Sequence, residues 1–309
     1  MAEIVITEFM EQSAVSSLAA DFDCLYDPRL VDDAARIHAM LADCRGLIVR
    51  NRTRVDAAMM DAAPNLRVIG RLGVGLDNID LDAAAERGIR VCPATGANAA
   101  CVAEYVLLAT LHLLRPLTLA TAPMLAGDFP RPAFSNGREI GGRVLGLIGG
   151  GMIGREVARR AIPLGMTVLV ADPMLEHGVQ DDGSEVVSLN DCLSRADAVS
   201  LHIPLTPETA GMMNGAMLAR MKPGSVLINT ARGGIVDHAA LARLMRDGRI
   251  SGAALDVFDD EPASAESLAM FDGIENLILT PHIAGLTEES NHRVSGITAD
   301  QVRAALEEG

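Results

Sequence analysis

Aromatic residues, long apolar runs and positive charge are what this sequence has least of. Its 309 residues include no tryptophan, two tyrosines and six phenylalanines, so few side chains can stack on nucleic-acid bases. Acidic residues outnumber basic ones by 41 to 26, and the formal net charge is -15. This balance disfavours nucleic acid and anionic membranes as partners, and no apolar run is long enough to cross a bilayer.

Metal-binding and disulfide patterns are also missing. The five cysteines are scattered, form no Cys-x-x-Cys pair and have no zinc-ligand spacing with histidine: Cys24, Cys44, Cys92, Cys101 and Cys192. We therefore expect no metal and free thiols in a reducing compartment. The N-terminal stretch "MAEIVITEFMEQ" carries acids and lacks a basic segment before an apolar one, so we expect no signal peptide and a cytoplasmic location.

The residues that are present indicate an α/β protein with two domains. Hydrophobic residues make up 49% of a chain long enough for two cores. Short apolar runs alternate with helix-like stretches, which is typical of parallel sheets covered by helices. The runs form two series: 3–7, 46–50, 67–70 and 89–92, then 143–149, 166–172, 198–203, 225–230, 252–257 and 277–282. Helical patterns include 31–44, 80–88, 98–115, 155–165, 238–248 and 289–309.

The second series opens on a glycine motif typical of dinucleotide binding. In "VLGLIGGGMIGREVA", Gly149, Gly151 and Gly154 have G-x-G-x-x-G spacing between an apolar run and a helical pattern. Such a turn brings backbone N–H groups and a helix N-terminus to a pyrophosphate. Asp172, at the end of the next predicted strand, would accept hydrogen bonds from the adenosine ribose. The residues after it, "PMLEHG", offer no cation for a 2′-phosphate, which favours NAD over NADP.

Three charged side chains follow later strands of this series. Arg232 lies in "INTARGGIVD", Glu261 in "ALDVFDDEP" and His282 in "LTPHIAG". Taken singly, each has an ordinary alternative, namely a surface charge, a solvated turn and a core or capping histidine. Together they suit oxidation of a hydroxy acid, because histidine accepts the hydroxyl proton, a carboxylate stabilises the imidazolium and arginine holds the substrate carboxylate.

With these residues in place, the chain resembles the D-isomer-specific 2-hydroxyacid dehydrogenase family, which includes D-3-phosphoglycerate dehydrogenases. The resemblance is carried, in the family's order, by "GRLGVGLDNID" at 70–80, "NAACVAEYVLLATL" at 98–111, "LGLIGGGMIG", "LHIPLTPET" at 201–209, "MKPGSVLINTARGGIVD" at 221–237, "ALDVFDDEP" and "TPHIAG". It implies an NAD-dependent oxidoreductase with Arg232, Glu261 and His282 as catalytic residues.

The resemblance also implies ligand contacts. Cofactor contacts would come from Val74, Gly149, Gly151, Met152, Ile153, Gly154, Asp172, His202, Ile203, Pro204, Thr230, Ala231, Arg232, Asp256, His282 and Gly285. Asp256 would lie near the nicotinamide carboxamide. Substrate contacts would come from Arg50, Arg52, Val74, Gly75, Arg232 and His282, with the backbone N–H groups of Val74 and Gly75 facing the substrate carboxylate.

The same resemblance implies two doubly wound domains. A flavodoxin-like substrate domain would comprise residues 1–98 and 286–309, and a Rossmann NAD-binding domain, residues 99–285, would be inserted in it. The helix at 98–115 would belong to a homodimer interface. The chain is too short for the C-terminal regulatory domain of long phosphoglycerate dehydrogenases, so we expect no feedback control through one.

The stretch "IVRNRTR" at 48–54 raises the question of substrate. Arg50 and Arg52 would lie on one side if the backbone stays extended, and they would hold a second anionic group of the substrate. The chain also resembles the (S)-sulfolactate dehydrogenases of the family, so oxidation of (S)-3-sulfolactate to 3-sulfopyruvate is the leading hypothesis. Roles for Arg54 and Arg71 stay open.

Several alternatives remain at this point. The arginines could form a solvated edge that balances nearby acids. The protein could be a D-3-phosphoglycerate dehydrogenase, or a reductase of hydroxypyruvate or glyoxylate, although the arginines argue against an uncharged side chain. A non-catalytic NADH-responsive binding protein is a remote alternative, since fold alone does not determine activity.

Overall fold

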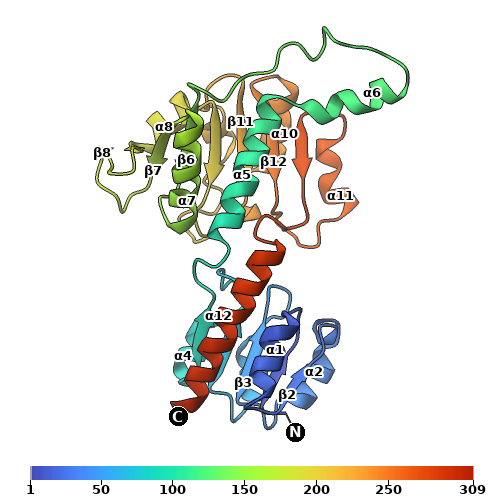
Figure 1. The fold of residues 1–309 in the computed structure, drawn as a ribbon, viewed down its shortest axis with the longest axis vertical. Coiled ribbons are helices and arrows are strands. Elements are labelled where there is room, and N and C mark those ends of the chain that lie inside the picture. The colour runs from blue at the N-terminus through green and yellow to red at the C-terminus, as the bar shows by residue number, and fades with distance from the viewer. Residues whose placement is uncertain (1, 309) are drawn as a thin grey trace. The chain divides into compact units, whose positions relative to one another are not determined.

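The computed structural model describes residues 2–308 and divides into two compact α/β units (Figure 1). Unit 1 comprises Met1–Asn98 and Leu286–Gly309, and unit 2 comprises Ala99–Gly285. These ranges coincide with the two domains that the sequence predicts. Each unit has its own sheet and its own buried core, so each is described by itself.

Unit 1 is built on a five-stranded parallel sheet of order β2-β1-β3-β4-β5. Its strands are β1 (Ile4–Ile6), β2 (Cys24–Tyr26), β3 (Gly46–Val49), β4 (Val68–Arg71) and β5 (Arg90–Pro93). Its helices are α1 (Gln12–Ala19), α2 (Ala34–Met40), α3 (Ala57–Asp61), α4 (Leu81–Glu86) and α12 (Glu288–Glu307). This is the flavodoxin-like strand order that the resemblance implies.

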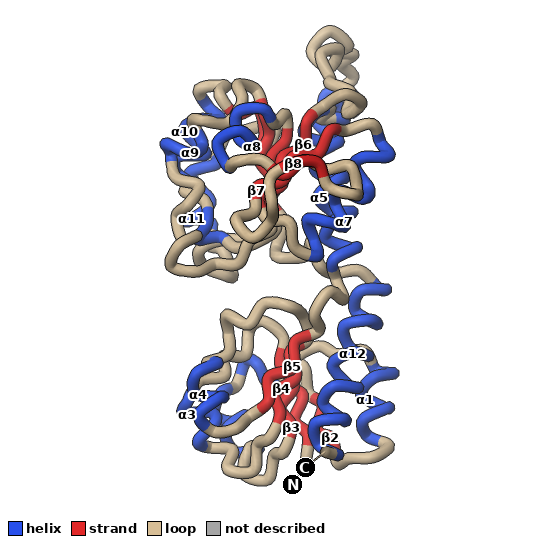
Figure 2. The backbone as a smooth tube through the Cα atoms, turned by 90° about the vertical axis from the view of Figure 1, so that its left-hand side faces the viewer, coloured by secondary structure: helices blue, strands red, loops and turns tan. Residues whose placement is uncertain are grey.

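Both faces of this sheet are covered by helices, so its strands are buried on both sides (Figure 2). Leu47 and Val49 point to the core shared with α2, α3 and α4, whereas Ile48 points to the core shared with α1 and α12. Helix α12 packs closely on β4, because a Cβ on Gly70 would lie 2.7 Å from a methyl of Val302. The C-terminal helix thus belongs to unit 1.

Unit 2 holds an eight-stranded sheet of order β13-β12-β11-β10-β6-β7-β9-β8, in which only β8 is antiparallel to its neighbour. The strands are β6 (Val144–Ile148), β7 (Thr167–Ala171), β8 (Gly178–Val179), β9 (Glu185–Val186), β10 (Ala198–Leu201), β11 (Ser225–Asn229), β12 (Ile250–Leu255) and β13 (Leu277–Leu279). Two doubly wound, largely parallel sheets confirm the predicted fold class.

The helices of unit 2 lie on both faces of its sheet (Figure 2). One core includes residues of α5 (Ala99–Leu114) and α7 (Met152–Ala161). The other includes residues of α8 (Leu189–Arg195), α9 (Gly215–Leu218) and α10 (His238–Arg246). Two further short helices are α6 (Thr121–Leu125) and α11 (Ala265–Leu268).

The sequence patterns missed some short elements. The predicted helix at 31–44 is instead a 3₁₀ turn at Leu30–Asp32 followed by α2, because the Asp33 side chain accepts the N–H of Arg36 and starts a new helix there. Helix α1, strand β2 and the β8–β9 hairpin were not predicted. These elements are short, and β2 and the hairpin lie at sheet edges.

Among residues 2–308, no single helix has the length and apolarity needed to cross a membrane. By length and composition alone, Ala99–Leu114 and Leu117–Leu125, bent by 50°, meet that test as a pair.

In each unit the strand order reverses at one place, and ligands of such sheets bind beside the carboxyl ends of the strands there. In unit 1 the reversal lies between β1 and β3, which are followed by Glu8 and Arg50. In unit 2 it lies between β6 and β10, which are followed by Gly149 and His202. The fold therefore places predicted ligand-binding residues at both reversals.

Candidate active site

The glycine turn of unit 2 has the geometry of a phosphate-binding turn. Gly149 has φ +105°, and a Cβ there would lie 2.5 Å from the carbonyl oxygen of His202. A Cβ on Gly154 would lie 2.3 Å from the carbonyl oxygen of Gly149. A Cβ on Gly151 would meet nothing within 4 Å. The protein's own packing thus requires two of the glycines, whereas the third leaves the backbone before α7 open to a ligand.

Asp172 is tied to this turn directly. Its Oδ2 accepts the N–H of Gly150 at 2.8 Å and its Oδ1 accepts the N–H of Met174 at 2.9 Å. The carboxylate at the end of β7 therefore lies beside the phosphate-binding turn, as binding of an adenosine ribose requires.

Buried polar atoms beside the turn also fit a dinucleotide. Both ring nitrogens of His202 and the hydroxyl of Thr230 are enclosed and have no hydrogen-bond partner among residues 2–308. Burial lowers the pKa of His202 to about 3, so its ring is neutral at physiological pH. Of the other predicted contacts, Met152 and Ile153 open α7, and Ile203 and Pro204 follow His202. We conclude that the residues present fit an NAD molecule.

Glu261 and His282 form a hydrogen-bonded pair. His282 Nδ1 lies 2.6 Å from Glu261 Oε2, and the other carboxylate oxygen accepts the N–H of Phe258 at 3.2 Å. Burial raises the pKa of Glu261, but the hydrogen bond and charge of His282, with smaller effects from Phe258 and Arg232, bring it below its usual value. Since Nδ1 is bonded to Glu261, Nε2 is the nitrogen that can exchange a proton with a bound molecule.

Asp256 holds the loop that carries His282. Its side chain is buried and accepts the hydroxyl of Thr280 at 2.6 Å and the N–H groups of Ile283 and Ala284, both at 2.8 Å. His282 itself has φ +56°, a left-handed conformation that these bonds support. Burial raises the pKa of Asp256 against the opposing effect of these hydrogen bonds. Sequence reasoning missed this anchoring role; contact with the nicotinamide carboxamide stays a prediction.

Arg232 follows β11 and lies in a loop packed against the segment that carries Glu261. A Cβ on Gly233 would lie 2.0 Å from the backbone of Phe258, so only glycine permits this approach. The Asn229 side chain fixes the loop by donating to the carbonyl of Arg232 at 2.9 Å. The positive charge of Arg232 contributes to the lowered pKa of Glu261. The structure therefore brings the three predicted catalytic residues together.

The glycine loop of unit 1 follows β4. Gly73 has φ +149°, and a Cβ there would lie 1.6 Å from Arg71 Nη1, so the Arg71 side chain folds against this loop. The backbone N–H groups of Val74 and Gly75 make no hydrogen bond to another residue in the described range. This geometry suits the predicted role of these two N–H groups in binding an anion.

The two arginines after β3 do not share a side. Arg50 is half-buried, and its Nη2 donates to Asn291 Oδ1 at 2.7 Å. Arg52 lies on the surface, where its Nη2 contacts Asp32 Oδ1 at 2.5 Å. The condition for a shared side, an extended backbone, is not met, because β3 ends at Val49 and the loop then bends. Arg54 is exposed and has no ion pair among residues 2–308.

A buried carboxylate that sequence reasoning did not identify explains the bend. Glu8 is 4% exposed and accepts the N–H groups of Arg50 at 2.8 Å, Thr53 at 3.0 Å and Arg52 at 3.2 Å. Its charge is therefore bonded to the backbone and not to a guanidinium. Among the described residues no carboxylate oxygen lies within 4.0 Å of the Arg50 guanidinium. Arg50 thus keeps its positive charge at the strand-order reversal.

Arg50 remains a cation in spite of its surroundings. Burial lowers its pKa, whereas the charges of Glu8 and Glu11 oppose that change. A guanidinium is protonated at all physiological pH values.

Within residues 2–308, no group of three or more metal-ligating side chains is present.

Comparison with known proteins agrees with this geometry. Residues 107–284 match the family model described as the NAD-binding domain of D-isomer specific 2-hydroxyacid dehydrogenases. An (S)-sulfolactate dehydrogenase of Chromohalobacter salexigens is 51% identical over 308 residues, which cover 99% of each chain.

Two further similarities are informative. A D-3-phosphoglycerate dehydrogenase of Mycobacterium leprae is 39% identical over 98% of this chain, but the match spans only 56% of that protein. The crystal structure of a D-lactate dehydrogenase from Aquifex aeolicus, solved with NAD and lactic acid, has a TM-score of 0.88 and 30% identity. The matched region covers 99% of this chain and 96% of the D-lactate dehydrogenase chain.

The glycine turn generates a first prediction. In Gly151→Ala the new methyl meets no protein atom, so thermal stability should stay within about 2 °C of wild type while NADH affinity falls about tenfold. In Gly149→Ala the methyl meets the His202 carbonyl, so stability and affinity should both fall. Fluorescence titration with NADH and thermal unfolding would measure both quantities. Unchanged NADH affinity in Gly151→Ala would contradict the assignment of this turn.

The Glu261–His282 pair generates a second prediction. His282→Ala should lower kcat by about 10²–10⁴-fold because no group remains to accept the hydroxyl proton. Glu261→Gln should lower kcat by a smaller factor, since the imidazolium loses its anionic partner. NADH titration of both variants serves as the control and should show that both still bind NADH. Full turnover by His282→Ala would rule out its role as the base.

Proposed function

Because this chain belongs to the D-isomer specific 2-hydroxyacid dehydrogenase family, we propose that it acts on a 2-hydroxy acid with a second anionic group. The family predicted from the sequence is confirmed, and the protein is an NAD-dependent oxidoreductase of CH–OH groups. Our leading substrate is (S)-3-sulfolactate, which would be oxidised to 3-sulfopyruvate. The observation that carries this proposal is the half-buried guanidinium of Arg50, which has no carboxylate oxygen of residues 2–308 within 4.0 Å.

The geometry supports a defined role for each catalytic side chain. His282 Nε2 accepts the proton of the substrate 2-hydroxyl, and Glu261 stabilises the imidazolium that forms. Arg232 binds the substrate carboxylate through its planar guanidinium. Bound NAD would supply the acceptor for the hydride that leaves C2. The products are then the 2-keto acid, NADH and a proton held by His282.

Arg50 suits the far end of such a substrate. A sulfonate carries a full negative charge at physiological pH, and a partly buried cation attracts it more strongly than a solvated one. The Asn78 side chain ties the arginine loop to the glycine loop by donating to the carbonyls of Thr53 at 2.7 Å and Arg50 at 3.3 Å. The name of the relative from Chromohalobacter salexigens points to the same substrate.

D-3-phosphoglycerate is a second candidate substrate, since its phosphate would also pair with Arg50. The enzyme with that name from Mycobacterium leprae matches 98% of this chain, but the match spans only 56% of that enzyme. Glyoxylate and hydroxypyruvate carry no second anion, so Arg50 has no partner on them. A non-catalytic NADH-binding role would leave the Glu261–His282 pair unexplained.

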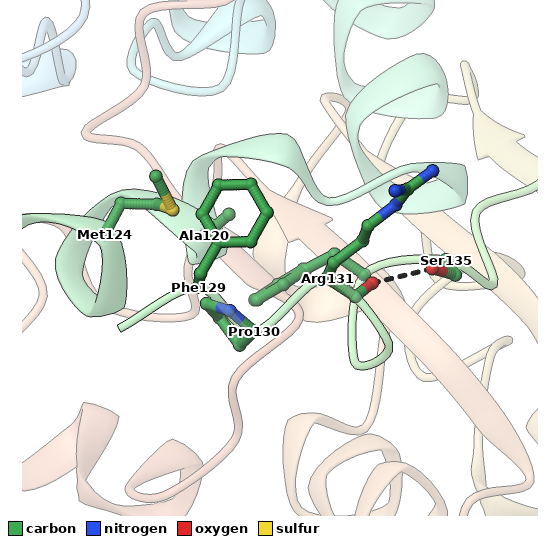
Figure 3. A pocket seen from close by; sticks show the side chains of 7 residues that line it. Ala120, Met124, Phe129, Pro130, Arg131 and Ser135 are labelled. Carbon is green, nitrogen blue, oxygen red and sulfur yellow. Dashed lines mark hydrogen bonds between the residues drawn. The ribbon is translucent and has the colours of Figure 1, made fainter. Parts of the chain in front are cut away.

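We also propose that the protein is a homodimer. Beyond α5, the segment 117–134 exposes a group of large apolar side chains, of which Leu117 is 66%, Leu125 85% and Phe129 77% exposed. Figure 3 shows Met124 and Phe129 beside Ala120 and Pro130, lining a pocket in this segment. Exposed apolar patches mark interaction sites, and a second copy of the chain would cover this one. We also propose a cytoplasmic location, which is supported by the five cysteines forming no disulfide within residues 2–308.

The substrate proposal predicts a difference between the two arginines. In Arg50→Met, kcat/KM for (S)-sulfolactate should fall by about 30–150-fold, which corresponds to roughly 2–3 kcal/mol for a lost charged contact. Arg52→Met should change it less than about twofold, because Arg52 is neutralised by Asp32 at the surface. D-Lactate is the control substrate, and kcat/KM for it should be unaffected by either substitution. Equal losses for both substrates would contradict the role of Arg50.

The dimer proposal predicts a change of mass on removing the apolar side chains. Wild type should have twice the chain mass of 32.5 kDa by light scattering after size-exclusion chromatography. The double variant Leu125→Asp/Phe129→Ser should become a monomer. Met174→Asp is the matched control, because Met174 is also apolar and 88% exposed but lies outside the segment. A monomeric wild type, or a double variant that stays dimeric, would refute the proposal.

A further inference from the structure

We infer that Asn291 is a positioning residue for recognition of the terminal anion, because its neutral amide oxygen orients Arg50 without cancelling its charge. This inference rests on the proposed function, in which Arg50 binds that anion. Asn291 lies in α12, some 240 positions along the chain from Arg50. No motif or spacing in the sequence joined the two residues.

The contact has the geometry of a strong hydrogen bond. Arg50 Nη2 lies 2.7 Å from Asn291 Oδ1, and the Arg50 guanidinium carbon lies 5.7 Å from the centre of the Phe9 ring. Arg50 Nη1 also approaches the carbonyl of Phe9 at 3.4 Å. The guanidinium is therefore held on two sides by uncharged groups. Its backbone is fixed by Glu8 at the same time.

Asn291 is itself held on a rigid element. Thr287 begins α12 with a capping box, in which its side chain accepts the N–H of Ser290 and the Ser290 side chain accepts the N–H of Thr287. The N–H of Asn291 donates to the carbonyl of Thr287 at 2.9 Å. Ser290, next to Asn291, is buried, and Val294, one turn further along α12, packs in the core of unit 1. The amide is thus fixed in place before any ligand binds.

The important property of the Asn291 side chain is that it carries no charge. An aspartate has the same size and could accept the same hydrogen bond, but it would form an ion pair with Arg50 and cancel its attraction for an anion. The structure contains that arrangement a few residues away, where Asp32 pairs with Arg52 on the surface. The two arginines of one loop therefore differ in partner: Arg50 is bonded to an amide, whereas Arg52 is paired with a carboxylate.

Two nearly isosteric changes test this inference in opposite directions. In Asn291→Asp, kcat/KM for (S)-sulfolactate should fall at least about tenfold, mainly through KM, whereas kcat/KM for D-lactate should change less than about twofold. The control is Asp32→Asn, which removes the carboxylate paired with Arg52, whereas Asn291→Asp adds a carboxylate that would pair with Arg50. In this control, kcat/KM should be unchanged for both substrates. Thermal unfolding should show both variants folded.

A double-mutant cycle shows whether Asn291 acts through Arg50. In an Arg50→Met background, Asn291→Asp should have no further effect on sulfolactate turnover. Asn291→Ala provides a second variant should the aspartate variant fail to fold, and it should raise KM for sulfolactate and not for D-lactate.

The outcomes distinguish a failure of this inference from a failure of the proposed function. If wild type prefers sulfolactate to D-lactate and Asn291→Asp keeps that preference, this inference is overturned while the proposed function stands. If wild type shows no preference for a substrate with a terminal anion, both the inference and the proposed function are overturned. Equal losses on the two substrates would indicate a structural role of Asn291 and would also overturn the inference.

Discussion

A buried carboxylate that accepts backbone N–H groups at the carboxyl end of a strand holds the functional loops of both units. In unit 1 this group is Glu8, after β1, which binds three N–H groups of the arginine loop. In unit 2 it is Asp256, after β12, which binds two N–H groups and a hydroxyl of the loop that carries His282. Hydrogen bonds to charged groups contribute about 1.5–3 kcal/mol each, enough to fix a loop that has no regular structure.

Fixing the loops through their backbone leaves the functional side chains free to differ in charge. The Glu8 carboxylate accepts backbone N–H groups of the arginine loop and forms no ion pair with the Arg50 guanidinium. In unit 2, His282 has a separate carboxylate of its own in Glu261. One loop thus presents a permanent cation and the other an acid–base pair. These are the two kinds of group that a substrate with a terminal anion and an oxidisable hydroxyl requires.

Sequence reasoning predicted what depends on local pattern. Parallel strands, the G-x-G-x-x-G turn and the set of Arg232, Glu261 and His282 all leave short-range signatures, and the structure places them as expected. Contacts between distant segments leave none. The Arg50–Asn291 bond depends on how α12 packs on the sheet, and the divergence of Arg50 and Arg52 depends on Glu8, a residue that reads as an ordinary acid in "ITEFM".

We propose that Arg50 binds the second anionic group of the substrate. A crystal structure of the protein with NADH and (S)-sulfolactate tests this most directly. We expect a sulfonate oxygen about 3 Å from a terminal nitrogen of Arg50, with the carboxylate on Arg232 and the 2-hydroxyl on His282 Nε2. A sulfonate bound by Arg52, or in contact with no cation, would contradict the account.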